Sequence, residues 1–396
     1  MTEDVGHARH QATMPCPACH HDVPAGRFCA HCGGQLSPAV GGGPTWLRVR
    51  HYAAAPGEHV LQPSIVSSVF PHLPQRSRGA FRLGLALVAV LLVSLSLTQW
   101  YIPMIAVAIF APTVLVALYL HETGLLGDLP RWLWVLTAVL GLSVGIAWAV
   151  LTRSIVAESY SLGLGAEIPT LRLIGDAVVI PFGALLSIQI PAVIVRMMRP
   201  PVSETLHGFV IGLIGATMFT VATNVVRMVP QFGETSVAGD QPVPAMLLEA
   251  GVRGVAEPLT GLSLGGLVGA ALWYQGRRRR NALLIGGLGL LIGSAAYASV
   301  GLAQAYRLPV SVQFLIHITF AAVAIVALRV GLQIMMLREN AEVYPELPIL
   351  CPSCEHVVPD TRFCASCGVS CLAAPTTSRV ARRRERPQPA LEAVDR

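Results

Sequence analysis

The chain has 396 residues, of which 53% are hydrophobic and only 13% are charged, with a mean hydropathy of +0.60 and a formal net charge of +6. A soluble globular protein of this length cannot carry so apolar a composition, so we exclude that class and predict a polytopic membrane protein. The sequence contains no lysine, and its basic residues are all arginine, a bias typical of a GC-rich bacterial genome.

The first motif along the chain is a cysteine pattern, CPACHHDVPAGRFCAHCG, at residues 16–33. Its spacing is C-x2-C-x9-C-x2-C, and its cysteines are Cys16, Cys19, Cys29 and Cys32. Paired C-x2-C turns deliver four thiolates to one tetrahedral Zn²⁺, and four sulfur ligands leave no open position for a catalytic water. We therefore predict a structural zinc ribbon over residues 1–37.

Residues 38–79 predict a linker, because the stretch 41–44 and scattered prolines oppose long helices. Eight windows of about 20 apolar residues, the length that crosses a bilayer, follow and predict a transmembrane helical domain over residues 80–338. These windows fall at 83–99, 102–120, 132–151, 174–195, 208–226, 255–274, 282–303 and 310–334. The first two windows are so close that they predict a tight helical hairpin.

Glycines recur at helical spacing in two of these windows. Gly208 and Gly212 lie four residues apart in one window, and Gly261, Gly265 and Gly269 repeat the same spacing in the next. Such spacing permits close approach of helix backbones. We expect these two helices to form the core of the bundle.

Arginines are distributed unequally between the two sides of the eight predicted spans. With the N-terminus inside, eleven lie at inner flanks: Arg76, Arg78, Arg82, Arg131, Arg196, Arg199, Arg277, Arg278, Arg279, Arg280 and Arg338. Five lie at outer flanks: Arg153, Arg172, Arg227, Arg253 and Arg307. The positive-inside rule then predicts an inner (plasma) membrane protein with both termini in the cytoplasm.

The cysteine motif is repeated at residues 351–368 as CPSCEHVVPDTRFCASCG, which matches the first copy at 12 of 18 positions. Its cysteines are Cys351, Cys354, Cys364 and Cys367. We predict a second zinc ribbon over residues 346–371, and thus two structural Zn²⁺ ions per chain. The likeness of the two copies leaves open whether each ribbon folds alone or both pack together as a double ribbon.

Residues 372–396 predict a basic disordered tail that carries Arg379, Arg382, Arg383, Arg384 and Arg386. Beside a bilayer, such a tail is better explained by contact with anionic lipid headgroups or by solvated charge than by nucleic acid. The expected partners are accordingly the lipid bilayer and a cytoplasmic or membrane protein, with nucleic acid disfavoured.

A few ionisable or polar residues fall inside the predicted spans, where they are costly and mark candidate sites. Asp176, Asn224 and Glu257 lie at similar predicted depth, with Arg227 and Arg253 nearby in sequence. We favour a structural network in which these charges neutralise one another. The alternative is an altered active site in which His317 serves as a metal ligand.

Three stretches of the membrane region resemble the PrsW family of intramembrane peptidases. LYLHETGLLGDLPRWLWVLTAVLGLSVG, starting at Leu118, is similar to the family's early hairpin. HGFVIGLIGATMFTVATN, residues 207–224, is similar to its glycine-rich helix, and RGVAEPLTGLSLGGLVGA, residues 253–270, to a later helix. The resemblance implies the fold of that family over roughly residues 115–275.

The positions at which the resemblance places catalytic residues are occupied by other residue types. The family's glutamate position falls on Thr223 and its histidine position on Thr260. Its paired glutamates fall on or near Ala184 and Leu185, whereas Asn224 and Arg253 are kept. A metal-dependent peptidase needs carboxylate or imidazole ligands and a general base, which threonine cannot replace.

The sequence therefore predicts an all-α membrane bundle with two small four-cysteine zinc ribbons and no catalytic residues. Our leading interpretation is a non-catalytic PrsW-like integral membrane protein whose cytoplasmic zinc ribbons bind or anchor protein partners. The alternative is a diverged intramembrane metallopeptidase that uses Asp176, Glu257 and His317. A transporter is a third, weaker interpretation, because no polar path through the midplane is evident.

Overall fold

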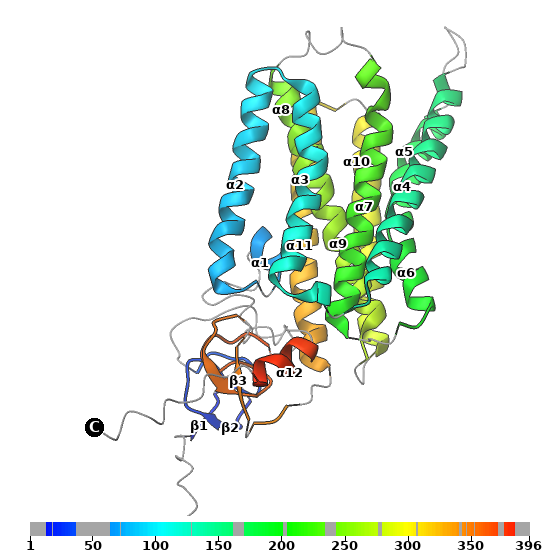
Figure 1. Ribbon diagram of the computed structural model, residues 1–396. Coiled ribbons are helices and arrows are strands. Elements are labelled where there is room, and N and C mark those ends of the chain that lie inside the picture. Colours follow the sequence, from blue (N-terminus) through cyan, green and yellow to red (C-terminus); the bar gives the residue numbers. More distant parts are fainter. Residues whose placement is uncertain are drawn as a thin grey trace, which may run out of the picture. The chain divides into compact units, whose positions relative to one another are not determined.

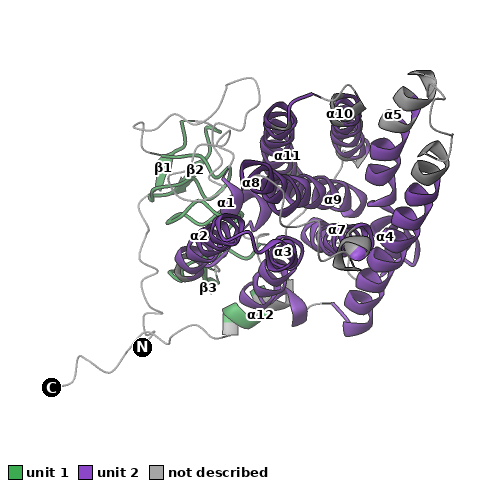
Figure 2. Cartoon of the chain, turned by 90° about the horizontal axis from the view of Figure 1, so that it is seen from above, with its two compact units in different colours: residues 1–60, 341–396 green, residues 61–340 purple. Residues whose placement is uncertain are grey.

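The computed structural model divides the chain into two compact units, residues 1–60 with 341–396 and residues 61–340 (Figures 1 and 2). The structure describes residues 13–17, 19–36, 64–71, 73–127, 129–160, 170–200, 204–233, 243–275, 279–305, 308–339, 343–345, 347–351, 353–370 and 376–384. We describe each unit by itself, as the helical unit and the ribbon unit.

The helical unit is a bundle of long helices, as the apolar windows predicted (Figure 1). Its helices are α1 (Ile65–Val69), α2 (Gln75–Leu97), α3 (Tyr101–Glu122), α4 (Arg131–Tyr160), α5 (Thr170–Ser187), α6 (Ile190–Met197), α7 (Thr205–Gly233), α8 (Val243–Gly251), α9 (Glu257–Trp273), α10 (Arg279–Ala305) and α11 (Val310–Arg338). A 3-10 turn covers Leu125–Gly127, and a π-helical segment, Val252–Ala256, joins α8 to α9.

Among the described residues, seven helical stretches are long and apolar enough to cross a membrane. They are Ser77–Leu97, Tyr101–Glu122, Arg131–Ser154, Val178–Met197, Thr205–Arg227, Val243–Trp273 and Ser311–Met336. The remaining predicted window lies in α10, whose apolar described stretch, Leu283–Ser299, is shorter. The all-α membrane bundle is confirmed, and an eighth crossing stays a prediction.

Helices α7 and α9 pack closely along their glycines, as the four-residue spacing predicted. A Cβ atom added to Gly212 would collide with the carbonyl oxygen of Gly265, and one added to Gly208 would collide with that of Gly269. The backbones therefore touch directly at these points. About 72% of the best apolar window in each of these two spans is buried, so this pair forms the core of the helical unit.

The helical unit begins earlier than the predicted boundary at residue 80. Within the predicted linker, α1 and the first residues of α2 belong to this unit. Helix α1 covers Arg329 of α11, whose Nη1 donates hydrogen bonds to the hydroxyls of Ser67 and Ser68 at 3.1 and 3.5 Å. Arg329 is only 2% exposed, so these hydroxyls, rather than water, accept hydrogen bonds from the buried guanidinium.

The ribbon unit contains two similar β-hairpins. Strand β1 (Thr13–Pro15) pairs with β2 (Asp22–Pro24), and β3 (Pro348–Leu350) pairs with β4 (Val357–Pro359), both antiparallel. Isolated bridges, Phe28 with Gln35 and Phe363 with Ser370, close the second half of each module. The repeated motif thus folds in the same way twice.

The predicted disordered tail is wrong for nine residues, Thr376–Arg384, which form helix α12. The Arg383 side chain pairs with Asp360, whose carboxylate is fully buried, and its guanidinium lies 4.8 Å from the Tyr344 ring. A buried carboxylate requires a charged partner, and this requirement explains why the segment is ordered. Residues 385–396 lie outside the described part of the chain.

Candidate metal centres and an intramembrane cavity

Each cysteine motif gathers its four sulfur atoms into one cluster. In the first, Sγ of Cys16 lies 3.7 Å from that of Cys32, and Sγ of Cys19 lies 3.7 Å from that of Cys29. A tetrahedron with Zn–S bonds of about 2.3 Å has an edge of about 3.8 Å. The spacing therefore fits one Zn²⁺ ion without rearrangement.

The second cluster repeats this geometry. Sγ of Cys351 lies 3.7 Å from that of Cys367, and Sγ of Cys354 lies 3.9 Å from that of Cys364. Hydrogen bonding with Cys351 lowers the pKa of Cys354 to about 6, whereas the same contacts, together with burial, raise the pKa of Cys351. Both predicted sets of four cysteines are thus brought together, and metal binding would release the remaining thiol protons.

Backbone amides and histidine rings make further contacts around the clusters. The amides of His31 and Cys32 point at Sγ of Cys29, at 3.4 and 3.3 Å. The ring of His21 contacts the Cys19 carbonyl at 2.8 Å, and His356 makes the same contact with Cys354 at 2.9 Å. These two ring contacts brace the turns that carry Cys19 and Cys354.

One further group near the first cluster could hold a metal by distance, namely Cys19, His21 and His31. The two imidazole rings stack with centroids 4.1 Å apart. Burial, together with the positive neighbours His21 and Arg362, lowers the pKa of His31. However, Cys19 already belongs to a complete set of four cysteines, so we assign the histidine pair no metal of its own.

The two ribbons pack on each other through reciprocal backbone hydrogen bonds. The Phe28 amide donates to the Ala365 carbonyl at 3.0 Å, and the Phe363 amide donates to the Ala30 carbonyl at 3.1 Å. Each motif contributes the same donor and the same acceptor position. The possibility of a double ribbon, which the sequence left open, is therefore realised as one pseudo-symmetric module.

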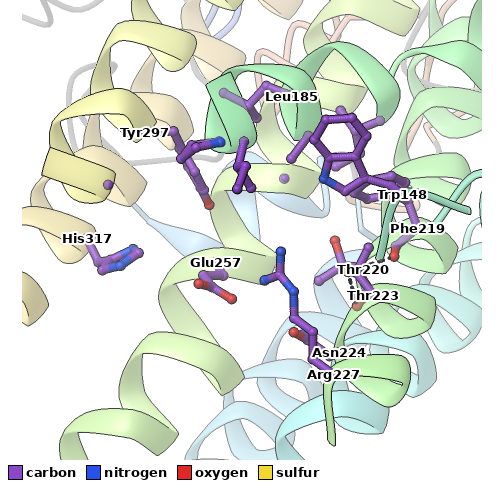
Figure 3. A pocket seen from close by; sticks show the side chains of 16 residues that line it. Trp148, Leu185, Phe219, Thr220, Thr223, Asn224, Arg227, Glu257, Tyr297 and His317 are labelled. Atoms are coloured by element: carbon purple, nitrogen blue, oxygen red, sulfur yellow. Dashed lines mark hydrogen bonds between the residues drawn. The ribbon is translucent and has the colours of Figure 1, made fainter. Parts of the chain in front are cut away.

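The helical unit contains a cavity of about 170 Å³ (Figure 3). Six helices line it: α4, α5, α7, α9, α10 and α11. Its polar lining comes from Thr220, Thr223, Asn224, Arg227, Glu257, Tyr297 and His317. Apolar side chains, among them Trp148, Ile188 and Phe219, also line it. In Figure 3, Trp148 and Phe219 lie on the side of Thr220 and Thr223, away from His317. The cavity is therefore amphipathic.

Glu257 and Arg227 project toward the space between them but do not form an ion pair (Figure 3). Among the described residues, neither side chain has a hydrogen bond or an ion pair within 4.0 Å. Glu257 follows directly on the π-helical segment Val252–Ala256. Such segments are frequent at functional sites, and the extra residue redirects the side chains beside it.

A second acidic residue and arginine in the same unit do form an ion pair. Arg253 Nη2 lies 2.9 Å from Glu249 Oε1, and the Tyr101 hydroxyl contacts the same oxygen at 3.4 Å. The sequence placed Arg253 in one network with Glu257. The structure instead pairs it with Glu249, four residues before it. Glu257 is also four residues away, but the π-helical segment Val252–Ala256 lies between the two and rotates Glu257 away from that face.

The positions that the PrsW resemblance marks as catalytic have local structural roles. The hydroxyl of Thr223 donates to the Phe219 carbonyl at 3.0 Å, and that of Thr260 donates to the Ala256 carbonyl at 2.8 Å. Among the described residues of the helical unit, no group of three or more His, Cys, Asp or Glu side chains could hold a metal. The side chain of Asp176 lies outside the described residues.

Sequence reasoning found Asn224, Arg227, Glu257 and His317 but did not join them to Trp148 and Tyr297. Aromatic residues are common in spans, and nothing in their spacing separates cavity walls from lipid-facing surface. Comparisons with models of protein families, with curated proteins and with solved structures found no match.

Proposed function

We propose that this chain is a non-catalytic integral membrane protein whose paired zinc ribbons, on the cytoplasmic side, bind or anchor a protein partner at the plasma membrane. One observation carries the proposal: two complete four-cysteine clusters are joined by reciprocal hydrogen bonds into a single module. Two saturated metal sites supply folding energy and no open ligand position, which suits a rigid binding surface rather than catalysis.

The membrane unit supports the non-catalytic part of the proposal. Hydroxyl groups of Thr223 and Thr260 occupy positions where a PrsW-type peptidase needs an acid and an imidazole, and both bond to their own helices. A PrsW-like fold that has kept its packing and lost its ligands is consistent with this arrangement. The unmatched comparisons leave this family relationship a proposal.

The test is crosslinking and co-purification from native membranes, with the intact chain compared with its Cys351→Ser variant. Cys371→Ser is the matched control, because Cys371 lies outside both C-x2-C-x9-C-x2-C motifs. We expect a defined set of proteins that is lost in Cys351→Ser and kept in Cys371→Ser. Equal recovery in both variants would show that the ribbons do not hold the partner.

The diverged metallopeptidase remains the second candidate, because Glu257 and His317 line one cavity. Metal analysis separates the two functions. The binding protein carries about two zinc ions per chain, and Glu257→Gln leaves that number unchanged. A third ion that is lost in Glu257→Gln, together with cleavage of a membrane-anchored substrate, would establish the peptidase instead.

A further inference from the structure

The open pair of charges in the intramembrane cavity points to a ligand. Glu257 is half-buried and Arg227 is exposed at the end of its span, and charged side chains within or beside a membrane span are costly when they lack partners. Elsewhere in the same unit, Glu249 and Arg253 do form an ion pair, at 2.9 Å. An acid and an arginine can therefore meet directly in this bundle. Glu257 and Arg227 instead face a shared space, and a ligand with both charges would satisfy them together (Figure 3).

The polar side chains that line the cavity offer two kinds of contact to a ligand. Glu257 lies beside His317, which is 4% exposed and whose ring stands edge-on to Tyr297 at 6.2 Å. No described residue hydrogen-bonds the His317 ring. A carboxylate and an imidazole nitrogen can accept hydrogen bonds from a primary ammonium group. Arg227, whose guanidinium carries donors in a planar fork, instead suits an acidic oxygen group such as a phosphate.

The size of the cavity and its apolar lining limit what can enter. A volume of about 170 Å³ holds roughly five or six water molecules, and so a small polar group rather than a peptide. The apolar lining, including Trp148 and Phe219, suits the carbon chain attached to such a group. Zwitterionic lipids surround a protein that crosses a membrane, and they combine these charges with a carbon chain. The soluble compounds that correspond to their headgroups carry the same charges.

We propose that this cavity binds a zwitterion composed of a primary ammonium and a phosphate, with the ammonium at Glu257 and His317 and the phosphate at Arg227 and Asn224. The ligand then forms an ion pair with each of the two charged side chains, Glu257 and Arg227. Its source is either the headgroup of an aminophospholipid or a free aminoalkyl phosphate. This binding is independent of the zinc ribbons and needs no chemistry at the site.

The experiment uses the full-length protein in detergent and isothermal titration with O-phosphoethanolamine. Ethyl phosphate, which lacks the ammonium, is the matched probe. We expect O-phosphoethanolamine to bind about tenfold or more tightly than ethyl phosphate, as the loss of a hydrogen bond to a charged group requires. Equal binding of the two probes, or no binding of either, in the unmodified protein would overturn the proposal whatever the variants do.

Variants then assign the two ends of the ligand. Glu257→Gln and Arg227→Met should each weaken O-phosphoethanolamine binding about tenfold or more, while Glu249→Gln, whose carboxylate is already paired with Arg253, should leave it unchanged. An unchanged thermal unfolding temperature in detergent confirms that the helical unit of each variant is folded. Undiminished binding in both Glu257→Gln and Arg227→Met would overturn the assignment of the site.

A lipid arm identifies the source. The protein is reconstituted in vesicles with equal amounts of phosphatidylethanolamine and phosphatidylglycerol, and co-purified lipids are counted by native mass spectrometry. Enrichment of phosphatidylethanolamine that is lost in Glu257→Gln supports a lipid headgroup. Tight binding of O-phosphoethanolamine without lipid enrichment supports the free compound. Enrichment of phosphatidylglycerol over phosphatidylethanolamine would contradict the requirement for an ammonium.

Discussion

Gly33 lies so close to the ring of Phe363 that an added Cβ atom would sit 2.7 Å from Cδ1 of that ring. The equivalent pair in the other ribbon, Gly368 and Phe28, repeats this contact at 2.6 Å. Both glycines also have a positive φ, of +73° and +74°. Each ribbon therefore places its phenylalanine against the only residue type that leaves room for it.

Gly33→Ala should loosen the double ribbon. The left-handed backbone alone costs about 1–2 kcal/mol for a residue with a Cβ atom, and the collision with Phe363 adds to it. We expect zinc to be released to a chelator at a lower temperature than in the unmodified protein. Combining Gly33→Ala with Phe363→Ala should add less destabilisation than the two single changes do in sum. A Gly33→Ala protein with unchanged zinc release would contradict the contact.

Zinc binding by the two ribbons should be coupled. The intact chain is expected to hold about two zinc ions, and Cys351→Ser about one. Because the ribbons share hydrogen bonds, loss of the second ion should also speed release of the first, measured as zinc transfer to a coloured chelator. Acidification should release both ions, since protons compete for the thiolates. Independent release rates would show that the ribbons fold separately.

Gly212→Ala should destabilise the helical unit, because the new methyl group meets the Gly265 carbonyl of α9. Overpacking of this kind costs about 1–3 kcal/mol. Gly79→Ala is the matched control, since an added Cβ there meets nothing within 4 Å. We expect thermal unfolding in detergent to shift downward for Gly212→Ala and to stay or rise for Gly79→Ala. Similar shifts in both would exclude a direct backbone crossing.

Glu339 should make stability depend on pH. Its carboxylate accepts a hydrogen bond from the Thr205 amide at 3.0 Å, at the start of α7. Burial raises its pKa above the ordinary value of 4.5. The folded state therefore holds a proton more tightly than the unfolded state, so this group's contribution is fully present below pH 4.5 and is lost as pH rises through the folded pKa.

Two variants test the role of Glu339. Glu339→Gln keeps an acceptor for the Thr205 amide and should flatten the pH dependence between pH 4.5 and neutrality. Glu339→Ala leaves the amide unpaired, which costs about 1–3 kcal/mol at every pH. Unfolding temperatures measured across this range check both outcomes. A Gln variant with the same pH profile as the unmodified protein would assign the dependence to another group.

Much of the architecture follows from local patterns in the sequence. Apolar windows predicted the membrane helices, and cysteine spacing predicted both metal clusters, because these signals depend on neighbours along the chain. The four-residue glycine spacing also predicted the packing of α7 on α9. Helix α12 was missed because its order depends on Asp360, a charge 23 residues away in sequence.

The cavity could be predicted only in part. Glu257 and His317 stand out in a sequence because charged and polar side chains are rare within spans. Their partners depend on which helices meet and on how each helix is rotated. The π-helical segment before Glu257 alters that rotation, and no periodicity in residues 252–256 reveals it. The pairing of Arg253 with Glu249 instead of Glu257 follows from the same local geometry.

The reciprocal bonds between Phe28, Ala365, Phe363 and Ala30 also set an order of events during synthesis. The first ribbon leaves the ribosome long before the second, and at ordinary translation rates the interval is on the order of tens of seconds. Throughout this interval the Phe28 amide and the Ala30 carbonyl lack their partners in the second ribbon. Biogenesis therefore includes a step in which the second ribbon, made later, closes over the first.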